Sequence, residues 1–82
     1  MRNKGQEIVL KALIENPTKT FTAKDFMYGK YFIGYEASAR MSEVARLYFE
    51  ILEIGKDGRF RTLRLRQDNE SRINEIKKML VS

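Results

Sequence analysis

"GKDGRFRTLRLR", residues 55–66, places five positively charged side chains and one negatively charged one in a segment that also contains residues suited to packing. Its GKDG motif supplies glycines for a tight turn with positive φ, and the run ILEI before it, residues 51–54, is typical of a strand. After the turn, apolar and charged residues alternate, which is the period of a strand with one buried face. The stretch therefore predicts a β-hairpin over about residues 51–66.

The alternation also assigns the faces of the second strand. Leu63 and Leu65 would point toward a core, which sends Arg64 and Arg66 to the opposite face. The positive residues nearer the tip extend past the core, and they are Arg59, Arg61 and, on the neighbouring strand, Lys56. The arginines are thus compatible with packing, and those at the tip are the first candidates for contact with a ligand.

Amphipathic helices are predicted at both ends of the chain. The first covers about residues 3–15 and stops at Asn16, just before the only proline. The last covers about residues 68–80, with Asp68 or Asn69 as its cap. Its apolar residues at helical spacing are Ile73, Ile76 and Leu80.

A short helix is predicted in the segment after the first one. Thr22 is a good N-cap, and Asp25 follows three residues later as a shorter version of the capping-box acid. Phe21 can pack on Phe26 as a hydrophobic staple. We expect this helix to end near Gly29, and the aromatic connection KYFIG after it to be partly buried.

The strongest helical pattern covers about residues 35–49. Its inward-facing residues are Ala37, Met41, Val44, Ala45, Tyr48 and Ile51. The opposite face presents Tyr35, Ala39, Ser42, Glu43 and Arg46, with Glu36 and Arg40 on its flanks. We expect this second face to have no role in packing.

Composition limits the functions that the chain can serve. The 82 residues form one small domain, and 43% hydrophobic content is enough for a core. Cysteine and histidine are both absent, so disulfides, thiolate metal sites and the commonest catalytic bases are excluded. We therefore expect no enzyme activity, no cofactor, no metal and no small-molecule ligand.

The charge and the apolar runs bear on partner and location. The net charge of +5 favours an anionic partner such as nucleic acid. The N-terminal apolar runs are short and broken by charges, which is unlike a signal peptide or a membrane span. We expect a cytoplasmic protein without a membrane partner.

The order helix, short helix, amphipathic helix, basic hairpin and helix resembles the winged helix-turn-helix family over about residues 5–66. The likeness is carried by GYEASARMSEVARLYFEILEIGKDGRFRTLRL, residues 34–65, and is to small prokaryotic, phage or virus members. By this likeness SARMSEVARL resembles the family's recognition helix, with Met41 and Val44 at its buried positions, and GKDGRFRTLRL resembles the wing.

The resemblance implies a fold of the α+β class, mostly helical, in a single domain over residues 1–82. Three N-terminal helices would form a helix-turn-helix core at about residues 5–49. A two-stranded wing at about 51–66 and a C-terminal helix at about 68–80 would follow.

The resemblance also implies sequence-specific binding of double-stranded DNA by a small transcriptional regulator. The third helix would enter the major groove, and the wing would lie on the backbone or in the minor groove. The residues expected to contact DNA are Lys24, Tyr35, Glu36, Ser38, Ala39, Arg40, Ser42, Glu43, Arg46, Lys56, Arg59 and Arg61.

Some of the residues expected to contact DNA could have other roles. Arg46 is spaced for ion pairs with Glu43 and Glu50, and Tyr35 could support the aromatic connection rather than touch DNA. A base-stacking platform for single strands is disfavoured, because most of the aromatic side chains are predicted to face inward.

The C-terminal helix has two interpretations. Its apolar surface either completes the core of the monomer or forms a homodimer, which would place two recognition helices on successive major-groove turns. The residues assigned to the dimer interface are Ile73, Ile76, Met79 and Leu80.

One alternative function remains open. Winged-helix domains are also used to dock proteins, so the chain could be a protein–protein interaction module that does not bind DNA. Binding that is insensitive to charge reversal at Arg59 and Arg61 would distinguish this role.

Overall fold

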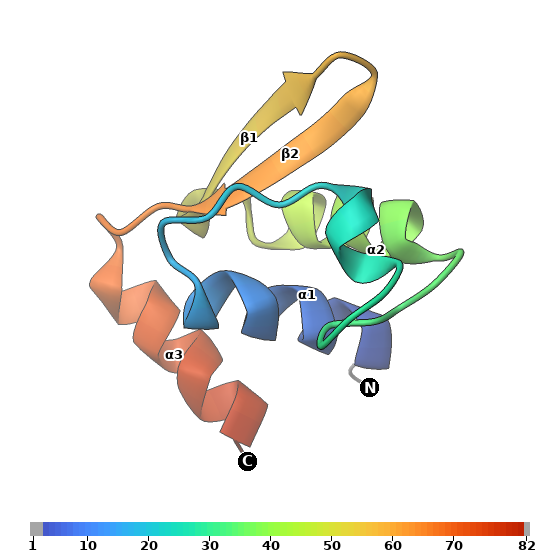
Figure 1. The fold of residues 1–82 in the computed structure, drawn as a ribbon. Helices are drawn as coiled ribbons and strands as arrows, with labels where there is room; N and C mark the ends of the chain where they lie inside the picture. Colours follow the sequence, from blue (N-terminus) through green and yellow to red (C-terminus); the bar gives the residue numbers. More distant parts are fainter. Residues whose placement is uncertain (1–2, 82) are drawn as a thin grey trace.

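The computed structural model describes residues 3–81, so residues 1, 2 and 82 of the predicted domain lie outside the described part. The fold is α+β and about half helical, with three α-helices and one two-stranded antiparallel hairpin in the described residues (Figure 1). The elements in chain order are α1 (Lys4–Glu15), the 3-10 helix η1 (Ala23–Phe26), α2 (Ala37–Leu47), the 3-10 helix η2 (Phe49–Ile51), β1 (Leu52–Asp57), β2 (Phe60–Leu65) and α3 (Glu70–Val81).

Helix α1 lies beneath α2 in the view of Figure 1. Asn3 caps it, because the Asn3 Oδ1 atom accepts a hydrogen bond from the Gln6 backbone N–H at 3.1 Å. The helix ends at Asn16, directly before Pro17, as its sequence predicts. Its buried residues are Val9, Leu10, Ala12 and Leu13.

The second predicted helix is a single 3-10 turn, so its predicted extension to Gly29 is wrong. The Thr22 N–H donates to Asp25 Oδ2 at 2.9 Å, and the Phe21 and Phe26 rings stack with centroids 5.5 Å apart. Both local contacts were predicted. Beyond Phe26, however, its carbonyl accepts from the N–H groups of Ile33 and Gly34 at 2.7 and 3.0 Å. These bonds close residues 27–33 into a loop instead of continuing the helix.

Helix α2 is shorter than the predicted 35–49 at both ends. Gly34 has a φ of +93°, and Tyr35 and Glu36 form a turn ahead of the first helical residue. At the other end the chain tightens into η2. The predicted inward residues Ala37, Met41, Val44 and Ala45 are buried.

The hairpin has a two-residue turn at Gly58 and Arg59, since Asp57 pairs with Phe60. Gly58 has a φ of +65° and is the only glycine of the GKDG motif in the turn, because Gly55 lies inside β1 opposite Thr62. The expectation that both glycines serve the turn is therefore wrong. β1 also starts one residue later than predicted, because Ile51 belongs to η2.

The alternation in β2 is confirmed at the base of the hairpin. Leu63 and Leu65 are buried, whereas Arg64 and Arg66 are exposed. Leu63 also forms an isolated antiparallel bridge with Phe21, with N···O distances of 2.8 and 2.9 Å in the two directions. The segment between α1 and η1 thus pairs with the hairpin and anchors its base to the helices.

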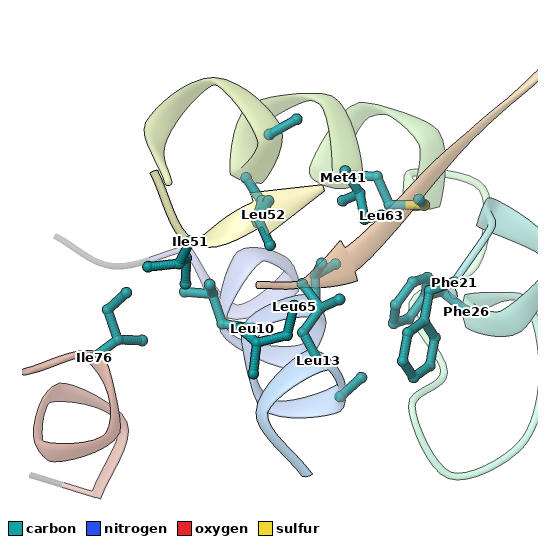
Figure 2. Packing of buried hydrophobic residues seen from close by; sticks show 14 of the residues in the cluster. Leu10, Leu13, Phe21, Phe26, Met41, Ile51, Leu52, Leu63, Leu65 and Ile76 are labelled. Carbon is teal, nitrogen blue, oxygen red and sulfur yellow. The ribbon is translucent and has the colours of Figure 1, made fainter. Parts of the chain in front are cut away.

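The core lies where α1, α2, η1 and the base of the hairpin meet. Figure 2 shows Leu65 of the hairpin beside Leu10 and Leu13 of α1, with Leu63 and Met41 above them and the stacked phenylalanines at one side. Burying one such side chain stabilises the fold by roughly 1.5–3 kcal/mol. The packing therefore holds the base of the hairpin firmly, while the tip projects beyond it.

Helix α3 begins after Asn69, whose Oδ1 accepts from the Arg72 N–H at 3.4 Å, so Asn69 rather than Asp68 is the cap. Ile73 and Ile76 are 6% and 1% exposed and belong to the core of this chain. Of the two predicted roles, completion of the monomer core is confirmed for these two residues. They are consequently covered before any dimer forms, which corrects their assignment to a dimer interface. Met79 and Leu80 pack partly against the same core.

An ion pair also ties α3 to the segment before the hairpin. The Arg72 Nε atom donates to Glu50 Oε1 at 2.7 Å, and Arg72 also contacts Glu75. The hydrogen bond from the Arg72 guanidinium lowers the pKa of Glu50 below its ordinary value.

Candidate nucleic-acid interface

The outward face of α2 presents small and polar side chains to solvent. Its exposed residues from the predicted set are Ser38, Ala39, Ser42 and Arg46, and Tyr35 and Glu36 are exposed in the turn before it. Tyr35 is fully exposed, so the alternative that it supports a buried connection is wrong. Small residues along a helix allow close approach of another surface.

Two residues that were predicted to contact DNA from the outward face of α2 instead contact α1. Glu43 Oε1 accepts from Gln6 Nε2 of α1 at 2.8 Å, and Glu43 Oε2 is 3.1 Å from an Arg40 guanidinium nitrogen. The methylenes of Arg40 cover Gly5, where an added Cβ would lie 2.6 Å from Arg40 Cγ. Arg40 and Glu43 are half-buried and join α1 to α2, so the prediction that this whole face has no role in packing is wrong for them.

The tip of the hairpin carries three positively charged side chains and one carboxylate. Lys56 lies directly opposite Arg61, and Arg59 occupies the turn beside them. Like charges directly opposite each other repel and destabilise a strand pair. Asp57 is the one carboxylate in the turn region, and it lies opposite Phe60. An anion bound near the tip would therefore reduce the repulsion between its positive charges.

Apart from Arg46, the arginines of the described chain that lie away from the tip are paired. Arg64 lies 4.0 Å from Glu53 across the strands, Arg66 pairs with Asp68, and Arg72 pairs with Glu50. Within residues 3–81 the arginines outside any ion pair are Arg46, Arg59 and Arg61. All three were predicted to contact DNA, and the predicted pairing of Arg46 with Glu43 or Glu50 is absent from this part of the chain.

A groove of about 190 Å³ separates α2 from the tip of the hairpin. Its lining residues are Ala23, Ser38, Met41, Ser42, Arg59, Phe60 and Arg61. Lys24 lies beside it, with its Nζ atom 4.8 Å from the centroid of the Phe60 ring. The structure thus brings together five of the predicted contact residues: Lys24, Ser38, Ser42, Arg59 and Arg61.

An exposed aromatic cluster near the start of α2 escaped the sequence analysis. Its members, which we call the aromatic loop cluster, are Met27, Tyr28, Phe32 and Tyr35. Met27, Phe32 and Tyr35 of this cluster border a largely apolar cleft of about 490 Å³, which Ile33 and Gly34 also line. The premise that most aromatic side chains face inward is therefore wrong, because Phe49 and Phe60 are exposed as well. The missed sequence signal was the pair of glycines Gly29 and Gly34, both of which have a positive φ in this loop.

The loop is fixed in place by Tyr31. Its hydroxyl donates to the Glu15 carboxylate and accepts from Asn16 Nδ2 at 3.1 Å. The first of these hydrogen bonds lowers the pKa of Glu15, with Lys30 and Lys11 acting in the same direction. The side chains of the aromatic loop cluster are therefore displayed by an anchored segment.

Comparison of the chain with protein-family models, curated proteins and solved structures finds no match. Within residues 3–81, no three side chains of the acidic, histidine or cysteine type come together as a metal site requires. None of the helices in the same range is both long and apolar enough to cross a bilayer.

Proposed function

We propose that this chain binds double-stranded DNA, and that it is a small, sequence-specific transcriptional regulator with a winged-helix arrangement. In this proposal α2 enters the major groove, and the tip of the hairpin lies on the backbone or in the minor groove. The observation that carries it is the convergence of the unpaired arginines of the tip with the exposed serines of α2 at one groove. The role is one of binding rather than catalysis.

The connectivity supports the winged-helix arrangement. A basic hairpin follows the amphipathic helix α2 after the short 3-10 helix η2, and the base of that hairpin is anchored through the Phe21–Leu63 bridge. An anchored ribbon presents its arginines without a large loss of conformational entropy on binding. The departure from the expected pattern is η1, which occupies the place of the second helix.

The geometry narrows the set of DNA contacts. We propose Lys24, Ser38, Ser42, Arg59 and Arg61 around the groove, with Lys56 beside the tip and Tyr35, Glu36, Ala39 and Arg46 along the outward face. We leave Arg40 and Glu43 out, because their contacts with α1 would have to break first.

We also propose a homodimer through α3, with an interface smaller than the one predicted from the sequence. Ile73 and Ile76 are buried in the core, so the end of the helix supplies the contact through Met79, Leu80 and the exposed Val81. Two copies related by a two-fold axis would present two copies of α2 to one duplex.

The deciding experiment is a fluorescence-anisotropy titration with mixed-sequence duplex DNA at several salt concentrations. We expect affinity to fall steeply with salt, and the double variant Arg59→Glu, Arg61→Glu to lose binding while keeping its circular dichroism spectrum. The matched control is Arg64→Glu at the base. A folded wild-type protein that fails to bind duplex DNA at low salt would refute the proposal.

A second candidate function is protein docking, and the aromatic loop cluster favours it. Contiguous exposed apolar residues commonly mark interaction sites. A pull-down with immobilised protein, repeated with the charge-reversal double variant and with Phe32→Ser, separates the two roles. Protein binding that survives the charge reversal and is lost with Phe32→Ser would establish docking.

A further inference from the structure

The groove between α2 and the hairpin tip is built from groups that bind oxyanions. Ser38 and Ser42 lie one helical turn apart on α2, and both line the groove. Arg59 and Arg61 line it from the hairpin. Hydroxyls and guanidinium groups both donate hydrogen bonds to phosphate oxygens, and the guanidinium bonds are charge-assisted.

Two arginines and no acidic residue are among the residues that line the groove. Within the described residues neither Arg59 nor Arg61 forms an ion pair. Lys56 lies opposite Arg61, and the Lys24 ammonium group lies over the Phe60 ring that lines the groove. A bound anion would relieve the repulsion between Lys56 and Arg61, so these charges favour an occupied groove.

The size and lining of the groove restrict the occupant. Its volume of about 190 Å³ is below the roughly 300–1,000 Å³ typical of pockets for organic ligands. Ala23, Met41 and Phe60 are the apolar residues of its lining, and an apolar surrounding strengthens charge-assisted hydrogen bonds. These properties suit one phosphate group more than a whole nucleotide.

We propose that the groove is a clamp for a single phosphate group, held jointly by Ser38, Ser42, Arg59 and Arg61. The natural source rests on the proposed function, in which the group is a backbone phosphate of the duplex. Because the four donors come from two elements, one occupant fixes the hairpin tip against α2. Such a contact positions α2 on the duplex without itself distinguishing sequences.

The test is a titration of the ¹⁵N-labelled protein with inorganic phosphate, followed by ¹H–¹⁵N correlation spectra against sodium chloride at equal ionic strength. We expect saturable shifts at the backbone amides of Ser38, Ser42, Phe60 and Arg61. Removing one charge-assisted donor with Arg61→Gln should weaken phosphate affinity about tenfold or more. Ser42→Ala, which leaves the charge unchanged, should weaken it as well.

Arg64→Gln is the matched control, because it removes the same charge from the other face of the same strand. We expect it to change phosphate affinity by less than about twofold, since a screened charge outside the groove contributes little. Equal losses in Arg61→Gln and Arg64→Gln would overturn the clamp in favour of diffuse attraction. The absence of saturable shifts in the folded wild-type protein would overturn it too.

Competition identifies the source of the phosphate and separates this inference from the proposed function. Duplex DNA with 5′-hydroxyl ends that displaces phosphate from the same amides supports a backbone source, whereas displacement only by a 5′-mononucleotide supports a terminal one. If the protein binds phosphate but not the duplex, the DNA-binding proposal is refuted and the phosphate clamp is supported. Duplex binding that leaves the groove amides unshifted defeats the clamp and leaves the proposal.

Discussion

The two ends of the hairpin both carry positive charge, but the cross-strand partner of the arginine differs between them. At the base, Arg64 faces Glu53 across the strands and the leucines of β2 are buried in the core. At the tip, Lys56 faces Arg61 and no core lies beneath them. The arrangement at the base stabilises the fold, because opposite charges face each other there. The arrangement at the tip destabilises it, because like charges face each other. A feature that opposes stability is a pointer to binding.

Breaking the base should have the largest effect. Leu63 is fully buried and bridges Phe21, so Leu63→Ala leaves a cavity at the junction of hairpin and helices. We expect the free energy of unfolding, measured by urea denaturation, to fall by about 2–5 kcal/mol. Arg61→Ala at the tip is the control and should change stability by under about 0.5 kcal/mol. Equal losses at the two positions would contradict the division into an anchored base and a projecting tip.

Straining the turn should have the next largest effect. Gly58 has a φ of +65°, a conformation that costs an L-residue about 1–2 kcal/mol. Gly58→Ala should therefore lower the free energy of unfolding by about that amount, although nothing lies within 4 Å of the added methyl group. Gly55→Ala supplies a contrast, because its Cβ would meet Thr62 Oγ1 at 3.0 Å while its φ is ordinary. A neutral Gly58→Ala in thermal denaturation would rule out backbone strain in the turn.

Exchanging the charge patterns tests the comparison directly. Lys56→Glu places a carboxylate opposite Arg61 and should stabilise the fold by about 0.2–1 kcal/mol while weakening duplex binding. Glu53→Lys creates the reverse situation opposite Arg64 and should destabilise the fold by a similar amount. Both values come from urea denaturation at low salt. A Lys56→Glu variant that binds duplex DNA as well as the wild-type protein would remove the tip from the interface.

The smallest predicted effect concerns pH at the segment leading into the base. The Arg72 guanidinium lowers the pKa of Glu50 in the folded chain below its ordinary value of 4.5. The pair therefore contributes stability above pH 4.5 that is lost as pH falls through the lower, folded value. For this half-exposed pair we expect under about 1 kcal/mol. The difference in unfolding free energy between the wild-type protein and Glu50→Gln should shrink over that range, and a constant difference would contradict the assignment.

The sequence predicted most of what depends on local periodicity. The alternation of Leu63 and Leu65 with arginines located the hairpin and its buried face, and the spacing of Met41 and Val44 located α2. These predictions succeeded because the apolar period of an element determines which of its faces can be buried. The length of η1 was missed because it depends on Phe26, whose carbonyl bonds to residues seven and eight positions later.

The candidate site divides in the same way. The charge of the tip is visible in the sequence, since no acidic residue follows it before Asp68. The contacts of Arg40 and Glu43 with α1 are not visible in the sequence, because Gln6 and Glu43 lie 37 positions apart in the chain. A helical pattern shows which residues share a face and says nothing of which distant element covers its edge.

By itself the sequence determined the order of the α-helices and the hairpin, the buried faces of the α-helices and of β2, and the excess of positive charge at the hairpin tip, because periodicity and composition are local properties. Only the tertiary structure decided which charges stay unpaired, which aromatic side chains face solvent, and that Ser38 and Ser42 share a groove with Arg59 and Arg61. Those outcomes depend on contacts between segments far apart in the chain, whose geometry is set by packing of the whole core.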